Sequence, residues 1–193
     1  DMKGVICMKH GRLGLCVFLL LALSGCQEEE GSEYILPIGS QYFLGKESYA
    51  DIDNHETDSF SLDSTYANEV TVEDEYLILE ANDSQVKKLI ENNQKMMEEI
   101  AQEFEAINDH FSVEWSDDYS SVIFNVDSEG LFSDDPNDAL ENMSHSFWIN
   151  YILQTNRILM TRDCDIAVDV TYKNANSGYI LSKGLFPYES FTL

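Results

Sequence analysis

The chain has 193 residues, of which 44% are hydrophobic and 11% aromatic, and this composition favours one small domain with a packed core and argues against a disordered chain. Its formal net charge is −25, from 11 Lys and Arg against 36 Asp and Glu, so nucleic acid and anionic lipid headgroups would repel it. Such acidity predicts either a solvated, colloidally stable surface or attraction to cations or to a basic protein partner.

The N-terminal segment has the pattern of an export signal. Lys9 and Arg12 precede an apolar run at residues 13–23, and small residues follow. This charged, apolar and small-residue order is typical of a secretory signal peptide. The apolar run is much shorter than the roughly 20 residues that a transmembrane helix needs. We therefore predict a signal peptide at residues 1–25, with residues 1–7 as a candidate upstream extension.

The residues at the end of this signal predict an anchor. Leu23, Ser24, Gly25 and Cys26 resemble the lipobox of bacterial lipoproteins, in which a branched apolar residue and two small residues precede an acylated cysteine. The resemblance covers the signal alone. It implies that the Cys26 thiol takes a diacylglycerol group and that a peptidase cleaves between Gly25 and Cys26. It also implies an extracytoplasmic protein held on a bacterial membrane, because two acyl chains give stable attachment.

The residues directly after Cys26 leave the destination within the cell envelope open. Gln27 is followed by Glu28, Glu29 and Glu30, and this acidic segment resembles the signal that sends some lipoproteins to the outer cell surface. Acidic residues just outside a membrane also follow from the charge asymmetry of export. Display on the cell surface and retention elsewhere in the envelope are therefore both hypotheses.

The cysteines predict no internal disulfide. Cys7 and Cys16 lie in the export signal and acylation would consume Cys26, so Cys164 is left without a partner. We interpret Cys164 as a small, partly buried side chain.

A tether is predicted at residues 26–68. The segment is rich in Ser, Asp, Glu and Gly and shows neither helical nor alternating periodicity. Residues 34–44 within it are apolar enough to dock on the domain or on a partner. The tether would give the anchored domain its reach.

The remaining residues, 69–193, predict a single α+β domain. Residues 70–81 contain a short apolar run at residues 76–79 that suits a buried strand, and Asn82, Asp83 and Ser84 supply helix caps. Apolar residues at three- and four-residue steps then predict one face of a long helix: Val86, Ile90, Met97, Ile100, Phe104, Ile107 and Phe111.

Two β-hairpins are predicted, at residues 112–126 and 166–185. In the first, apolar and polar residues alternate on both sides of a turn at Asp117 and Asp118; in the second, they alternate up to Tyr172, and the chain returns after a turn at residues 173–178.

A second helix is predicted between these hairpins. Asp135 followed by Pro136 is typical of an N-cap and a first-turn proline. The expected apolar stripe of this helix is Leu140, Met143, Phe147, Tyr151, Ile152 and Leu159.

The order of these elements predicts the fold. The first six give β-α-β-β-α-β, the order of ferredoxin-like folds, and a C-terminal strand follows. We therefore expect a two-layer sandwich in which an antiparallel sheet carries two helices on one face. A fold of this kind hosts many functions, so it predicts none.

An acidic cluster before the second helix is a weak candidate for calcium. Asp134, Asp135 and Asp138 could offer oxygen ligands, but they lack the spacing of an EF-hand loop, and capping of the helix explains them equally well. The histidines His55 and His110 are isolated in the sequence, as is His145, which we interpret as a surface or interface residue. We therefore predict neither a metal nor a cofactor.

Three function classes remain as hypotheses. The first is a non-enzymatic, lipid-anchored binding or accessory domain, attached to the membrane through Cys26 and suited to a basic protein partner. The second is an inhibitor or immunity-type lipoprotein that neutralises a basic toxin or hydrolase. The third is a small envelope enzyme that uses paired carboxylates, such as Glu114 with Asp117 or Asp169. Two close carboxyl groups in a pocket would favour the enzyme, and an exposed apolar patch would favour binding.

Overall fold

The structure is a computed structural model that describes residues 31–48, 50, 62–73, 75–127 and 136–189, without the side chains of residues 136–143. The predicted signal peptide, with Gly25 and Cys26, lies outside the described residues. The described residues belong to one compact unit that begins at Gly31.

A three-stranded sheet consists of β1 (Ser32–Pro37), β2 (Glu69–Glu73) and β3 (Tyr76–Ala81). The strand order is β1-β3-β2, and both pairs are antiparallel. Because successive side chains in a strand point to opposite faces, one face of this sheet is apolar. The fully or almost fully buried side chains on that face are Tyr34, Leu36, Leu77 and Leu79.

A four-stranded sheet consists of β4 (Ser112–Trp115), β5 (Ser121–Val126), β6 (Val168–Asn174) and β7 (Ile180–Phe186), in that spatial order. The pairs β4–β5 and β6–β7 are antiparallel hairpins, which confirms both hairpin predictions. The central pair β5–β6 is parallel.

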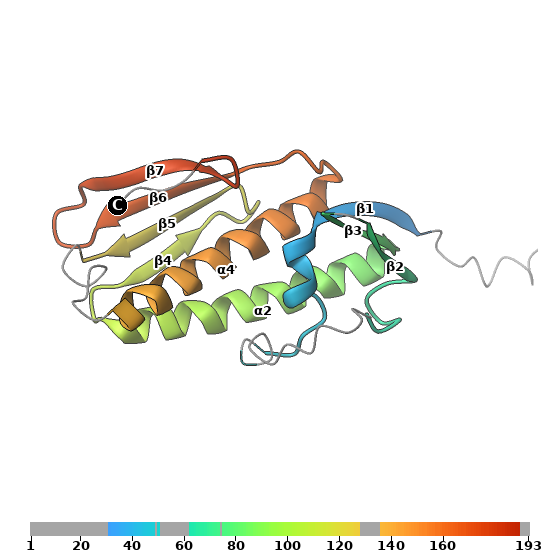
Figure 1. Cartoon of the computed structure of the whole chain (residues 1–193), viewed down its shortest axis with the longest axis horizontal. Coiled ribbons are helices and arrows are strands. Elements are labelled where there is room, and N and C mark those ends of the chain that lie inside the picture. Colours follow the sequence, from blue (N-terminus) through green and yellow to red (C-terminus); the bar gives the residue numbers. More distant parts are fainter. Residues whose placement is uncertain (1–30, 49, 51–61, 74, 128–135, 190–193) are drawn as a thin grey trace, which may run out of the picture. The chain divides into compact units, whose positions relative to one another are not determined.

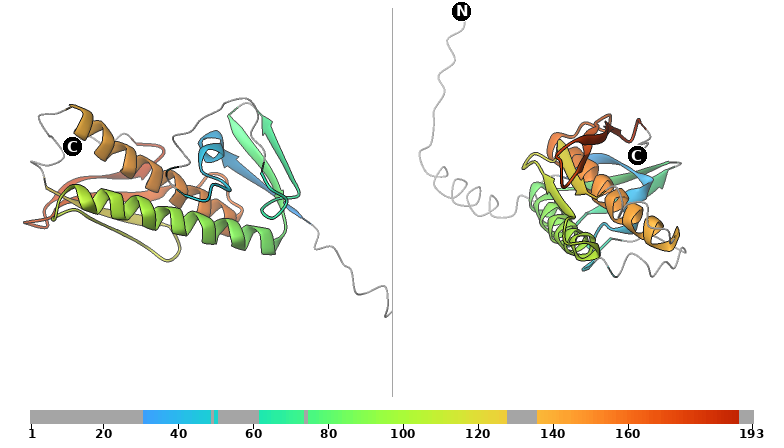
Figure 2. Two further views of the ribbon diagram at one scale, coloured as in Figure 1. Left: turned by 90° about the horizontal axis from the view of Figure 1, so that it is seen from below. Right: turned by 90° about the vertical axis from the view of Figure 1, so that its left-hand side faces the viewer.

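Two long helices run side by side (Figure 1), α2 (Asp83–Ile107) and α4 (Pro136–Thr161). The predicted capping of α2 is confirmed, because Asn82 and Gln85 form a reciprocal capping box with two hydrogen bonds of 2.9 Å. The helices are antiparallel, so Asp83 at the start of α2 lies beside Arg162 just after α4. Figure 2 shows the three-stranded sheet at this end of the helix pair.

Stacked aromatic rings join α2 to the four-stranded sheet. Phe104 of α2 stacks on Phe111 and meets Phe124 of β5 edge-on, with ring centroids 5.1 and 5.8 Å apart. Phe124 in turn stacks on Tyr172 of β6 at 5.0 Å. The predicted apolar face of the first helix therefore covers this sheet through Phe104, which is 1% exposed.

The mixed α+β class is confirmed, but the prediction of one antiparallel sheet in ferredoxin-like order is wrong. β3 pairs with β1 and β2 rather than with β4 or β6. The length of α2 explains the separation: its 25 residues carry the chain about 37 Å, whereas a six-residue strand such as β3 spans only about 20 Å. The helix therefore delivers β4 too far from β3 for the two strands to share a sheet.

Two further predictions for the N-terminal half have different outcomes. The buried strand expected from the apolar run at residues 76–79 is confirmed as β3, and β2 pairs with it as a second strand that the sequence did not predict. The tether expected at residues 26–68 contains β1 and a 3-10 helix, η1 (Ile38–Tyr42). Phe43 and Leu44, directly after η1, are 0% and 2% exposed and belong to the hydrophobic core. These described residues therefore form part of the folded domain and are not a tether.

Helix α4 is buried on several sides, so the single apolar stripe predicted for it is wrong in part. Ile152 and Leu159 are buried, but Phe147 is 47% exposed. Polar residues occupy buried positions that face different neighbours. Toward α2, Asn93 Nδ2 donates a hydrogen bond to Asn156 Oδ1 at 2.8 Å. Toward η1, the hydroxyls of Ser40 and Thr155 lie 2.8 Å apart, and both residues are fully buried.

Candidate functional site

The outer face of the three-stranded sheet carries three glutamates in register. Glu80 of the central strand lies directly opposite Glu33 of β1 on one side and Glu69 of β2 on the other. All three side chains are exposed. Residues directly opposite on antiparallel strands have Cβ atoms about 4.5–5.5 Å apart and share a face of the sheet. We call these three residues the glutamate row.

Apolar side chains lie beside the glutamate row on the same face. The next register position places Ile35 opposite Ile78, and the one after it includes Tyr76 opposite Glu73. Ile35 is 36% exposed and Tyr76 52% exposed. The glutamate row, Glu73 and Ile78 line a shallow hollow of about 360 Å³. The outer face thus combines a line of carboxylates with an exposed apolar strip.

No cation of the described residues neutralises this face. The ion pairs among them involve neither the glutamate row nor Glu73. Like charges directly opposite on neighbouring strands destabilise a sheet, by a few tenths of a kcal/mol to about 1 kcal/mol per pair. The row therefore lowers the stability of the free domain.

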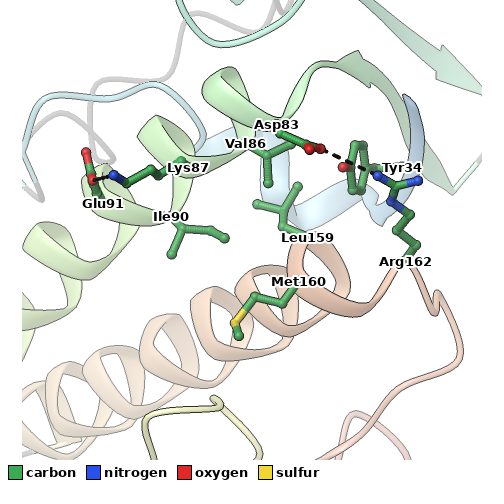
Figure 3. A pocket seen from close by; sticks show the side chains of 9 residues that line it. All are labelled: Tyr34, Asp83, Val86, Lys87, Ile90, Glu91, Leu159, Met160 and Arg162. Carbon is green, nitrogen blue, oxygen red and sulfur yellow. Dashed lines mark ion pairs between the residues drawn. The ribbon is translucent and has the colours of Figure 1, made fainter. Parts of the chain in front are cut away.

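A second feature is an apolar groove of about 400 Å³ between the start of α2 and the end of α4 (Figure 3). Its apolar lining comes from Tyr34, Val86, Ile90, Leu159 and Met160. Met160 is 52% exposed, whereas Tyr34 and Leu159 are buried. We call this feature the helix groove.

Charged side chains of both signs stand at the rim of the helix groove. Arg162 pairs with Asp83 at 3.6 Å, and Lys87 pairs with Glu91 at 3.7 Å. The Arg162 guanidinium also lies over the ring of Tyr34, with 5.6 Å between its central carbon and the ring centroid. Both ion pairs are exposed, and such pairs typically contribute about 0–1 kcal/mol, so a ligand can replace them at little cost.

The backbone places Arg162 at this rim. Arg162 has a φ of 61°, in the left-handed region, and its N–H donates to the carbonyl of Ile158 at 2.7 Å. A left-handed residue with this hydrogen bond is a common way to end a helix, although the position usually holds glycine. Because this position holds arginine where glycine is usual, its side chain extends from the end of α4 to Tyr34 and Asp83.

Of the predicted paired carboxylates, Glu114 and Asp169 lie on strands that are not neighbours. Glu114 lies on the edge strand β4, opposite Ile123 of β5, and two strands away from β6, which carries Asp169. Asp169 instead pairs with Lys183 at 3.8 Å. Asp117 lies in the turn after β4.

The neighbouring Asp118 has a structural role in that turn. Its Oδ1 accepts hydrogen bonds from the hydroxyls of Ser116 and Ser120, both at 2.7 Å. These bonds, that of Ser120 above all, lower the pKa of the Asp118 carboxyl to about 2.

The calcium candidates Asp134 and Asp135, and the side chain of Asp138, lie outside the described residues. In the described part of the chain, no three His, Cys, Asp or Glu side chains are grouped to hold a metal ion. Cys164 is a free and exposed thiol, not the partly buried side chain that the sequence predicted.

Of the two interpretations of His145, as a surface or an interface residue, the surface position is wrong, because His145 is 3% exposed. It lies on α4, and its Nε2 is 3.5 Å from a carboxylate oxygen of Glu103 on α2. It is therefore part of the interface between the two helices.

No protein-family model, no curated protein and no solved structure matches this chain. None of the helices in the described ranges combines the length and the apolar character that a membrane-spanning segment needs.

Neither surface was predicted from the sequence. The only local signal for the glutamate row is the alternation of Glu69, Thr71 and Glu73 with Val70 and Val72, and this pattern does not reveal which strands are neighbours. The helix groove depends on the packing of the start of α2 on the end of α4, where the paired residues Asp83 and Arg162 are 79 positions apart in the chain.

Proposed function

We propose that this protein is a lipid-anchored, extracytoplasmic binding protein without enzymatic activity, and that the glutamate row binds a basic segment of a partner protein. The observation that carries the proposal is the register of Glu33, Glu80 and Glu69 on an exposed sheet face. The lipobox-like residues that end at Cys26 support the anchor.

The arrangement of the outer face suits a partner with alternating basic and apolar side chains. Neighbouring strands lie about 4.8 Å apart, so the three carboxylates extend across the sheet over about 10 Å. Lysine or arginine side chains of a partner can bridge neighbouring carboxylates and relieve their repulsion. The exposed apolar side chains of Ile35 and Tyr76 offer contacts next to those charges. Binding would thus convert a destabilising surface into a stabilised one.

The binding test uses a short fluorescent peptide that alternates lysine and leucine. We expect Glu80→Gln to weaken its binding by about fivefold, because Glu80 contributes to both carboxylate pairs of the row. Glu114→Gln is the matched control, since it removes the same charge from the exposed face of the other sheet. Equal weakening by both variants would mean that the peptide responds to net charge alone, and the proposed site would be wrong.

The anchor is tested separately in cells. We expect a metabolically incorporated fatty acid to label the protein, and Cys26→Ala to abolish both the label and cleavage after Gly25. Normal processing of the Cys26→Ala variant would identify an ordinary secretory signal and refute the lipid anchor.

A further inference from the structure

The chain between the proposed lipid attachment and the domain is short. Only residues 27–31 separate Cys26 from Ser32, where β1 begins. A chain rises at most about 3.5 Å per residue, so the two Cα atoms can be no more than about 20 Å apart. An acylated Cys26 would therefore keep the start of β1 close to the membrane surface, which a tether of residues 26–68 would not do.

The helix groove opens at this same end of the domain. Tyr34, which lines the groove, follows Ser32 by two residues, or about 7 Å along the strand. Ser32 is paired with Ala81, and α2 begins two residues after Ala81. Arg162 lies over Tyr34 and brings the end of α4 to the same place.

The charges of the helix groove match a zwitterionic headgroup better than an anion. Its rim holds two cations, Arg162 and Lys87, each beside a carboxylate. The phosphate of such a headgroup can bind the guanidinium of Arg162 or the ammonium of Lys87, while the lipid's own ammonium contacts the carboxylate of Asp83 or Glu91. The overall charge of −25 repels anionic lipids but does not repel a headgroup of zero net charge.

The interior of the helix groove suits the aliphatic part of a lipid. Its wall consists of Val86, Ile90, Leu159 and the exposed Met160. A volume of about 400 Å³ lies within the usual range of small-molecule sites, which is roughly 300–1,000 Å³.

We propose that the helix groove faces the membrane and binds a zwitterionic phospholipid of the bilayer in which the protein is anchored. This inference rests on the lipid anchor of the proposed function. The groove holds the headgroup between Arg162 and Asp83 and the first part of an acyl chain along Met160 and Ile90. It thereby gives the anchored domain a fixed orientation and turns the same side to every neighbouring membrane protein.

The experiment uses the full lipidated protein in vesicles that contain a photoactivatable zwitterionic phospholipid. Mass spectrometry locates the cross-linked residues and also reports whether Cys26 carries its diacylglyceryl group. We expect cross-links to concentrate in the first turns of α2 and at residues 159–162. Anionic photoactivatable lipid in its place should give several-fold fewer cross-links at these positions.

Two matched variants test the groove itself. Met160→Asp adds a charge to the groove, and Tyr179→Asp adds the same charge at a 73% exposed position in the turn before β7. We expect the first variant to reduce cross-linking at least fivefold and the second to leave it unchanged, with equal thermal unfolding temperatures.

The outcomes separate the two proposals. If Cys26 is acylated but cross-links are scattered over the domain, or if Met160→Asp has no effect, the groove proposal is overturned and the anchor stands. If Cys26 is not acylated, the anchor fails, and the groove proposal fails with it.

Discussion

Asp169 and Glu80, which lie on the outer faces of the two sheets, have neighbours of opposite charge. On the four-stranded sheet, Asp169 of β6 lies 3.8 Å from Lys183 of the neighbouring strand β7. On the three-stranded sheet, Glu80 lies between two more glutamates, and no cation of the described residues pairs with it. Both faces are exposed and belong to the same acidic chain, so overall charge does not explain the difference. This difference supports the proposal that the glutamate row is a binding surface.

The largest expected effect concerns what supports the three-stranded sheet. We expect Phe43→Ala to lower the free energy of unfolding by about 3–5 kcal/mol, because Phe43 is fully buried directly after η1, which contacts β3 of that sheet. Phe124→Ala, which removes an equally buried ring from the four-stranded sheet, is the control and should cost about the same. Chemical denaturation of the three proteins makes the measurement. If Phe43→Ala leaves the free energy of unfolding almost unchanged, residues 34–44 do not support the fold, and the prediction of a tether would be right for them.

A smaller effect is expected where the same segment meets α4. A methyl group on Gly39 would lie 2.6 Å from a ring carbon of Tyr151. We therefore expect Gly39→Ala to destabilise the domain by about 1–3 kcal/mol, as overpacking usually does. Combining it with Tyr151→Leu should recover part of the loss, and thermal unfolding of the single and double variants measures this coupling. Additive losses would show that η1 does not pack on α4 as described.

Removal of one charge from each sheet tests the comparison directly. Glu80→Gln should stabilise the domain by about 0.5–1 kcal/mol, because it ends two repulsive cross-strand contacts. Asp169→Asn should have no stabilising effect, because it breaks the contact with Lys183. Unfolding temperatures at low ionic strength provide the readout, and added salt should narrow the difference. A destabilising Glu80→Gln would mean that the row contributes to the fold and is not kept for a partner.

The smallest effect belongs to the turn of the four-stranded sheet. The hydroxyls of Ser120 and Ser116 lower the pKa of Asp118 from its usual value near 3.8 to about 2. A carboxyl with a lowered pKa in the folded state stabilises the protein above about pH 4, and this contribution disappears as the pH falls through about 2. An NMR titration should therefore give Asp118 a pKa of about 2, and Ser120→Ala should raise it. An unchanged pKa of Asp118 in the Ser120→Ala variant would show that the Ser120 hydroxyl does not lower that pKa.

The sequence predicts the four-stranded sheet better than the three-stranded sheet. Both hairpins of the four-stranded sheet were predicted, because their strands are close in sequence and alternate around recognisable turns such as Asp117 and Asp118. β1 was not, because its partner β3 lies more than 40 residues further along the chain and its exposed Ile35 blurs the alternation. The glutamate row depends on the register of these distant strands, so no local pattern could reveal it.

Helix α4 was misinterpreted for a different physical reason. A helix that buries one face shows a clear apolar stripe, but α4 contacts α2, β1, η1 and β6. Asn150, Gln154 and Thr155 are buried among these neighbours, so polar residues interrupt the stripe. The amide Nε2 of Gln154, for example, donates to the carbonyl of Ile166 at 3.1 Å. Partners of this kind are known only when the tertiary structure is known.

The asparagine pair between the helices favours one position of α2 along α4. Asn93 and Asn156 are fully buried, and a single hydrogen bond joins them, donated by Asn93 Nδ2 to Asn156 Oδ1. If α2 moved along α4 by one turn, about 5.4 Å, both amides would meet apolar side chains and lose that bond. Such a shift costs several times the thermal energy, whereas an interface made only of leucine and isoleucine would tolerate it more easily. β3 leads directly into α2, and α4 leads toward β6. The position of α2 along α4, which this hydrogen bond favours, therefore also influences the distance between the two sheets.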